Sequence, residues 1–142
     1  MRIILSLVLF SLLVVSFPLS AADKDSTKTD KQITLAEALK NGQPVLALFS
    51  TTKACNCVMR RCNSAATLVD SLVAGYKDKF VYVKIDLSVT PELGIDYKVM
   101  SPPVLIGFDK TGIETKRFYS DSLNGPAIEN LMSEISKKSA NK

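Results

Sequence analysis

A run of five apolar residues, Val45 to Phe49, most constrains what this chain can fold into. The run follows Pro44 and contains no polar residue, so its side chains do not alternate between a core and water. Such a run is typical of a strand that is buried on both faces of a sheet. We therefore predict an α/β protein with a central mixed sheet flanked by helices.

The other segments predict helices and strands on either side of that run. Thr34 to Glu37 matches a capping box, in which a Thr hydroxyl and a Glu carboxylate each bond a free backbone N–H at a helix start. The later patterns predict, in order, a helix with an apolar stripe from Cys62 to Tyr76, a strand over 80–86, a short helix from Thr90, strands over 104–108 and 113–119, and a final helix carrying Ile128, Leu131, Met132 and Ile135. We expect a single domain over 33–138 with a tail at 139–142, because domains commonly run to about 100–150 residues.

The first 22 residues have the pattern of a secretory signal peptide. Arg2 is the only charge before an apolar stretch that ends at Phe17, and small residues occupy positions 20 to 22. We expect cleavage after Ala22, a disordered leader over 23–32, and a periplasmic or secreted monomer without a membrane anchor. An uncleaved N-terminal anchor is the alternative. The folded stretch has no basic block with interleaved aromatic residues, so we expect no nucleic-acid partner.

Three cysteines, with no histidine and no tryptophan, limit the chemistry of the chain. Without His there is no Ser-His or Cys-His catalytic pair and no His-ligated metal. Cys55, Cys57 and Cys62 all follow the predicted buried strand, where a helix N-terminus would favour the reactive thiolate form. Arg60 and Arg61 lie within about one helical turn and are expected to stabilise a thiolate, with simple solvation of both arginines as the alternative.

The spacing of the three cysteines leaves their pairing open. If the helix begins between Cys55 and Cys57, Cys62 lies about 7.5–10 Å farther along its axis, beyond the Cα separation of about 7 Å that a disulfide spans. Cys55 and Cys57 would then form the only pair, in a strained and oxidising ring. If the helix begins near Met59, Cys62 could pair with either of them. Cys62 also lies on the apolar stripe, so a buried structural thiol is a further alternative.

The element order, with cysteines after the first buried strand and prolines before the third, resembles the thioredoxin-like fold. Residues 43–49 look like the strand that leads into the family's active site, 80–86 are similar to its second core strand, and 100–108 resemble its proline-containing segment. This resemblance implies that Pro103 is a cis-proline facing the active cysteines, with Pro102 beside it in the substrate groove. The chain departs from the family because C-x-C-x4-C replaces the usual Trp-Cys-x-x-Cys, and because Pro102 has no N–H to offer a substrate strand.

These residues favour an exported thiol–disulfide oxidoreductase that uses no cofactor. Cys55 would attack or hold a mixed disulfide, Cys57 would resolve it, and Pro103 would shape the groove. The partners would be protein thiols or disulfides and a redox-recycling protein. The main alternative is a Cu(I)-binding module with Cys55, Cys57 and Cys62 as soft thiolate ligands. A redox-silent adaptor, and a thiol peroxidase suggested by the T-x-x-C of Thr52 to Cys55, are further alternatives.

Overall fold

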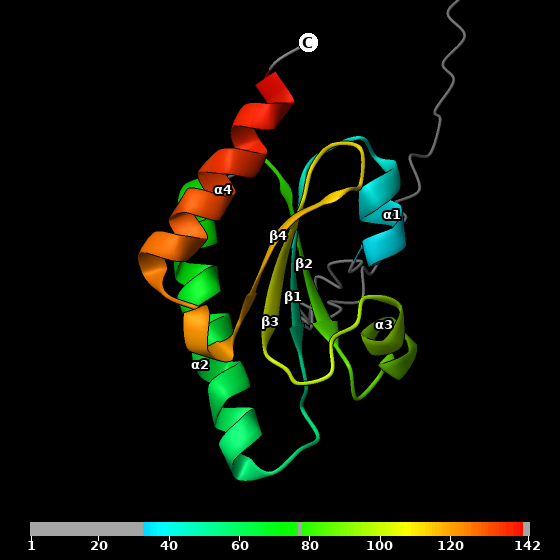
Figure 1. The fold of residues 1–142 in the computed structure, drawn as a ribbon, viewed down its shortest axis with the longest axis vertical. Coiled ribbons are helices and arrows are strands. Elements are labelled where there is room, and N and C mark those ends of the chain that lie inside the picture. Colours follow the sequence, from blue (N-terminus) through cyan, green and yellow to red (C-terminus); the bar gives the residue numbers. More distant parts are fainter. Residues whose placement is uncertain (1–32, 77, 141–142) are drawn as a thin grey trace, which may run out of the picture.

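A computed structural model describes residues 33–76 and 78–140 of the chain, and the predicted signal peptide and leader lie outside these ranges. Its centre is a four-stranded mixed sheet with the strand order β2-β1-β3-β4 (Figure 1). The inner strand β1 (Val45–Ser50) pairs in parallel with β2 (Val81–Asp86) and antiparallel with β3 (Val104–Phe108). β3 in turn pairs antiparallel with β4 (Glu114–Tyr119).

Helices cover both faces of the sheet, as the apolar run predicted (Figure 1). α1 (Leu35–Lys40) and α3 (Pro91–Asp96) lie on one face, and α2 (Asn56–Val73) and α4 (Gly125–Ala140) lie on the other. Two short 3-10 helices, η1 (Ala74–Tyr76) and η2 (Ser120–Ser122), follow α2 and β4. In the described ranges no helix combines the length and the apolar character needed to cross a membrane.

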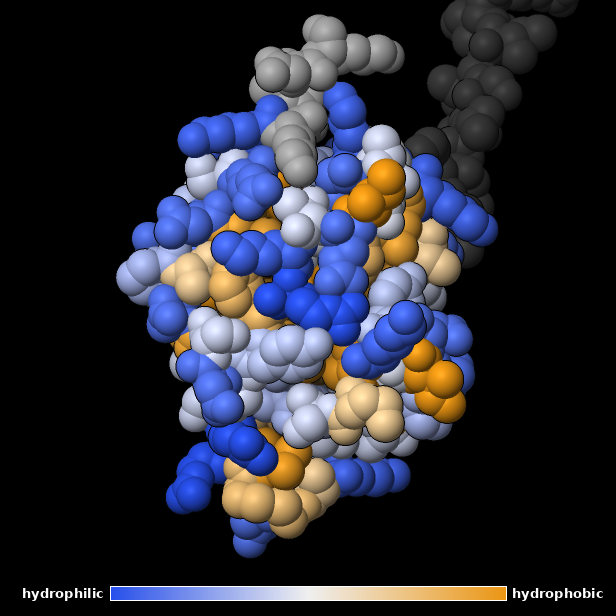
Figure 2. All heavy atoms as spheres, in the orientation of Figure 1, coloured by the Kyte–Doolittle hydropathy of each residue, from blue (hydrophilic) through white to orange (hydrophobic). Residues whose placement is uncertain are grey.

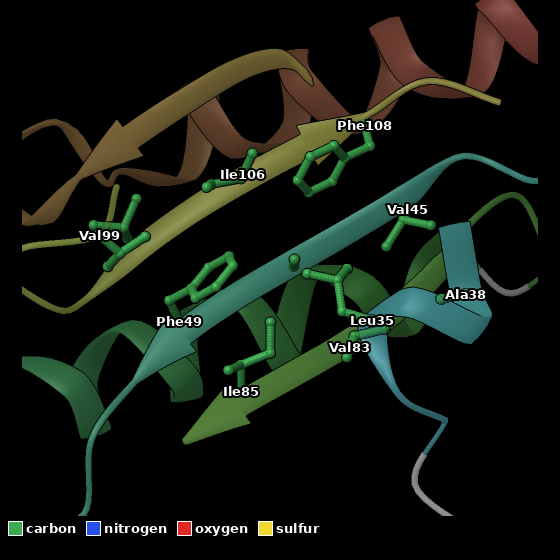
Figure 3. Packing of buried hydrophobic residues seen from close by; sticks show 11 residues of the cluster. Leu35, Ala38, Val45, Phe49, Val83, Ile85, Val99, Ile106 and Phe108 are labelled. Atoms are coloured by element: carbon green, nitrogen blue, oxygen red, sulfur yellow. The ribbon is translucent and has the colours of Figure 1, made fainter. Parts of the chain in front are cut away.

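The five apolar residues of β1 divide between two hydrophobic cores because alternate strand residues point to opposite faces. Val45, Ala47 and Phe49 belong to the core under α1, which Figure 3 shows from close by. Leu46 and Leu48 belong to the core under α2 and α4. All five side chains are fully buried, which confirms the prediction of a strand covered on both faces.

Local sequence signals set several element ends. Thr34 and Glu37 form the predicted capping box at the start of α1. The Thr90 side chain, in contrast, does not cap α3, because its hydroxyl donates to the Asp86 carbonyl instead.

At Gly107 in β3 the absence of a side chain matters, because a Cβ there would lie 2.7 Å from Leu131 Cδ1 of α4. This glycine lets α4 pack close to the sheet.

Candidate functional site

The cysteine cluster lies at the N-terminal end of α2, directly after β1 and its short loop. α2 begins at Asn56, and Cys55 is its N-cap residue with extended backbone angles of φ −63° and ψ 154°. The Cys55 carbonyl accepts hydrogen bonds from the N–H groups of Val58 and Met59 at 3.0 and 3.1 Å. Of the two helix starts that the sequence left open, the structure has the earlier one. A start near Met59 is therefore wrong.

Cys55 and Cys57 are exposed free thiols in contact with each other. The Cys57 thiol donates a hydrogen bond to the Cys55 sulfur, and this is the largest influence lowering the pKa of Cys55. The N–H groups of Val58 and Cys57 and the positive charge of Arg61 lower that pKa further. Cys55 is therefore the thiol of this pair that is prepared to act as a thiolate nucleophile.

Cys62 is separated from this pair by the helix itself. It is only 2% exposed and lies six residues beyond the first residue of α2, about 9 Å along the helix axis at 1.5 Å per residue. Burial raises the pKa of the Cys62 thiol, although the Thr51 N–H and the Arg61 charge oppose the rise. The structure thus brings Cys55 and Cys57 together and leaves Cys62 in the interior.

The three cysteines do not form the soft-metal site that was the main alternative. Among residues 33–76 and 78–140, no group of three or more His, Cys, Asp or Glu side chains is arranged to hold a metal ion. A Cu(I) site with Cys55, Cys57 and Cys62 as its three ligands is therefore not assembled in this fold. The physical reason is the early start of α2, which carries Cys62 along the helix and into the core.

An acidic residue that the sequence analysis missed holds the cysteine-bearing loop. The Asp86 carboxylate, at the end of β2, accepts hydrogen bonds from the Thr52 N–H at 3.2 Å and the Thr52 hydroxyl at 2.6 Å. It also accepts from the N–H and hydroxyl of Ser88, at 2.9 and 2.6 Å. Burial raises the pKa of Asp86, but the hydrogen bonds from Ser88 and Thr52 outweigh it and hold the pKa at about 2. Asp86 thus fastens the loop before α2 to the neighbouring strand.

The Pro102–Pro103 peptide bond is cis, as the resemblance implied for Pro103. Each proline lines a different surface hollow beside α2. Pro102 lines a hollow of about 500 Å³ together with Ala54 and Val58, whereas Pro103 lines one of about 340 Å³ together with Arg60 and Arg61. The segment before β3 therefore lies beside the start of α2, where Ala54 and Val58 precede and follow the two exposed cysteines in the sequence.

The Pro102 hollow has an apolar rim. Ile95 and Met100 both line it, and they are 78% and 90% exposed. Hydrophobic and hydrophilic side chains are mixed at the lower end of the molecule, where α2 begins (Figure 2). The two hollows beside the start of α2 thus differ in character, because the one at Pro102 is apolar and the one at Pro103 is cationic.

Comparison with known proteins bears on the fold. No family model matches the sequence, and no curated protein matches it. Among solved structures, the thioredoxin of Fasciola hepatica superposes with a TM-score of 0.56 and 19% identity, covering 72% of this chain and 95% of that one. This chain has a thioredoxin-like fold. A structure described as a malarial protein superposes with a TM-score of 0.54 and 17% identity, over 65% of this chain and 96% of that one.

The three stretches that resemble the thioredoxin-like family have the secondary structure that this fold implies for them. The stretches 43–49, 80–86 and 100–108 became β1, β2, and the cis-proline segment with β3. In this thioredoxin-like protein the residue three places after Cys55, where a C-x-x-C motif would have its second cysteine, is Val58. The partner thiol is supplied one position earlier, by Cys57.

Proposed function

We propose that this protein is an exported thiol–disulfide oxidoreductase in which Cys55 is the nucleophile and Cys57 is the resolving thiol. The observation that supports it best is the contact between the two exposed thiols at the N-terminus of α2, which lowers the pKa of Cys55. The thioredoxin-like fold and the cis-proline segment beside the cysteines support the same reaction class. The N-terminal sequence pattern supports export.

The exchange takes place in two steps. The Cys55 thiolate attacks one sulfur of a partner disulfide, the partner S–S bond breaks, and the other partner sulfur leaves as a thiolate. The Cys57 thiol then loses its proton and attacks the Cys55 sulfur of the mixed disulfide, which releases the second partner thiolate. The protein ends with a Cys55–Cys57 disulfide, and the partner has gained two electrons and, from water, two protons.

The preferred direction of exchange is the reverse of these steps, so that the protein delivers its disulfide to partner thiols. A C-x-C disulfide closes a very small ring, and a lowered pKa stabilises the reduced form of Cys55. Both effects make the disulfide more oxidising. A redox-recycling protein would then restore the Cys55–Cys57 disulfide by accepting the two electrons.

The test follows the oxidation of a peptide with two cysteines by the purified disulfide form. Cys55→Ser and Cys57→Ser cannot form the Cys55–Cys57 disulfide, so we expect neither variant to oxidise the peptide. When the peptide is supplied in its disulfide form instead, reduced Cys57→Ser should attack it through Cys55 and accumulate a mixed disulfide that mass spectrometry detects on Cys55, whereas Cys55→Ser should not. Cys62→Ala removes a thiol that the fold buries away from the pair, and we expect it to retain exchange. Thiol titration first shows that Cys55 and Cys57 are accessible in the reduced protein. If such protein then gives no exchange, the proposal is overturned.

A further inference from the structure

Two arginines on the first two turns of α2 have no acidic partner within the described part of the chain. Arg60 and Arg61 are exposed, and neither belongs to the salt bridges that join Lys84 to Asp70 and Arg117 to Glu114. Most exposed charges are simply solvated. These two are distinctive because both line the same hollow, and because one of them, Arg61, also acts on the reactive thiol.

That hollow has the lining expected of a site for an acidic group. Its volume is about 340 Å³. Its lining includes the two arginines, the hydroxyl residues Ser64 and Ser120, and the apolar residues Pro103 and Leu123. No carboxylate lines it. A guanidinium group pairs with a carboxylate through two parallel hydrogen bonds, so the natural occupant is an Asp or Glu side chain.

One of the arginines that line this hollow also acts on the nucleophile. The charge of Arg61 reaches the Cys55 sulfur and helps to lower its pKa. The Pro102 hollow, in contrast, has no charged residue in its lining. Positively charged side chains therefore line the Pro103 hollow, whereas none lines the Pro102 hollow. A partner segment that crosses the two hollows would meet this asymmetry.

We propose that Arg60 and Arg61 make this protein select partner segments that carry an acidic residue on one side of their reactive cysteine. The inference rests on the proposed function and names its substrate class: a segment of a partner protein with an Asp or Glu near the cysteine. The acidic side chain enters the Pro103 hollow and pairs with the arginines while the partner sulfur lies at Cys55. Attraction between the arginines and an acidic partner segment raises the rate at which the two proteins meet productively, and salt screens this attraction.

The experiment uses short peptides whose single cysteine carries a thionitrobenzoate group in disulfide linkage. The reduced protein attacks the peptide sulfur through Cys55, the peptide–thionitrobenzoate S–S bond breaks, and the coloured thionitrobenzoate anion leaves. Four peptides are compared. The first has a Glu two positions before the cysteine, the second has a Glu two positions after it, and the third has no charged residue. The fourth has a Lys at the position where Glu gives the faster reaction. Every peptide has the same leaving group, so differences in rate report recognition of the segment.

We expect one of the two Glu peptides to react about tenfold faster than the neutral peptide at low salt, and the Lys peptide to react more slowly. The rate advantage of the Glu peptide should shrink severalfold at about 0.5 M salt, because the Debye length falls to about 4 Å. Arg60→Ser should reduce the ratio of Glu to neutral rates. Since Arg60 is not among the groups that shift the pKa of Cys55, a changed ratio reports binding and not thiol acidity.

Lys53→Ser is the matched control, because it removes an exposed positive charge near the loop that does not line the hollow. We expect it to preserve the ratio. Equal rates for all four peptides, or equal gains from both Glu peptides, would overturn the inference and leave the proposed function standing. Loss of reaction with every peptide would overturn the proposed function. A glutathione–thionitrobenzoate disulfide that reacts as fast as the better Glu peptide would mean that the hollow takes small anionic thiols, and would also overturn the inference.

Discussion

At the scale of single residues, the reactivity of Cys55 depends on its immediate neighbours. Its largest pKa-lowering contact comes from the Cys57 side chain, and Arg61 contributes from a distance. Cys62, one and a half to two turns farther along, has its pKa raised by burial. Cys55 and Cys62 thus differ in reactivity because Cys55 is the N-cap residue of α2, whereas Cys62 faces the core.

Alkylation rates measured against pH test this difference. Because the pKa of Cys55 is lowered, its thiolate persists to lower pH than an ordinary cysteine, and iodoacetamide should modify it first, as peptide mapping would show. Cys57→Ala removes the hydrogen bond and should shift the pH profile of Cys55 upward. Cys62 should react only after unfolding. Equal rates at Cys55 and Cys62 in the folded protein would contradict this account.

The carboxylate of Asp86 predicts a pH-dependent contribution to stability. Its pKa of about 2 in the folded protein lies below the value of about 3.9 for an unperturbed Asp. The contribution is therefore complete above about pH 4 and is lost as the pH falls through 2. At pH 7, Asp86→Asn should lower the free energy of unfolding by about 1–2 kcal/mol, because hydrogen bonds to a charged acceptor are replaced by weaker ones.

Urea unfolding of the wild type and Asp86→Asn at pH 7 and near pH 2 measures this contribution. The difference in the free energy of unfolding between the wild type and Asp86→Asn should be smaller at the lower pH. Asp121→Asn is a control on an exposed carboxylate in η2, and its effect should stay within about 0.5 kcal/mol. A difference between wild type and Asp86→Asn that is as large near pH 2 as at pH 7 would refute the assigned role.

At the scale of elements, the packing of α4 on β3 depends on one glycine. A Cβ at Gly107 would lie 2.7, 3.1 and 3.2 Å from three side-chain atoms of Leu131. We expect Gly107→Ala to lower the free energy of unfolding by about 1–3 kcal/mol, the usual cost of overpacking a close-packed core. Gly75→Ala is the matched control, since a Cβ there meets nothing within 4 Å. Urea midpoints of the two variants that coincide would contradict the packing argument.

Elements also show which parts of the structure the sequence could predict. β1 was predictable because its five apolar residues are buried on both faces. The start of α2 was not, because the apolar stripe begins at Cys62 and the preceding residues, 56–61, are exposed or only partly buried. The role of Asp86 in holding the loop was also not predictable, because Thr52, its hydrogen-bond partner in that loop, is 34 residues away in the sequence. Local patterns therefore located the cysteines, and long-range contacts decided how they are held.

At the scale of the whole molecule, a Cys55–Cys57 disulfide should not stabilise the fold. It closes a loop of three residues and so removes almost no entropy from the unfolded chain. The folded protein meanwhile favours the Cys55 thiolate, which exists only in the reduced form. We expect the reduced protein to unfold at an equal or higher urea concentration than the oxidised one. A clear gain in stability on oxidation would contradict an oxidising disulfide.

The packing of α2 against α4 also bears on when the thiol becomes reactive. Most of the stability of a helix in a protein comes from its tertiary packing, and Val69 of α2 shares its core with Ile128 and Leu131 of α4. The N–H groups of α2 that lower the pKa of Cys55 therefore depend on packing against α4, which follows them in the sequence. We expect a chain that lacks residues 125–140 to carry a Cys55 of ordinary reactivity, because α2 would then have lost its packing partner.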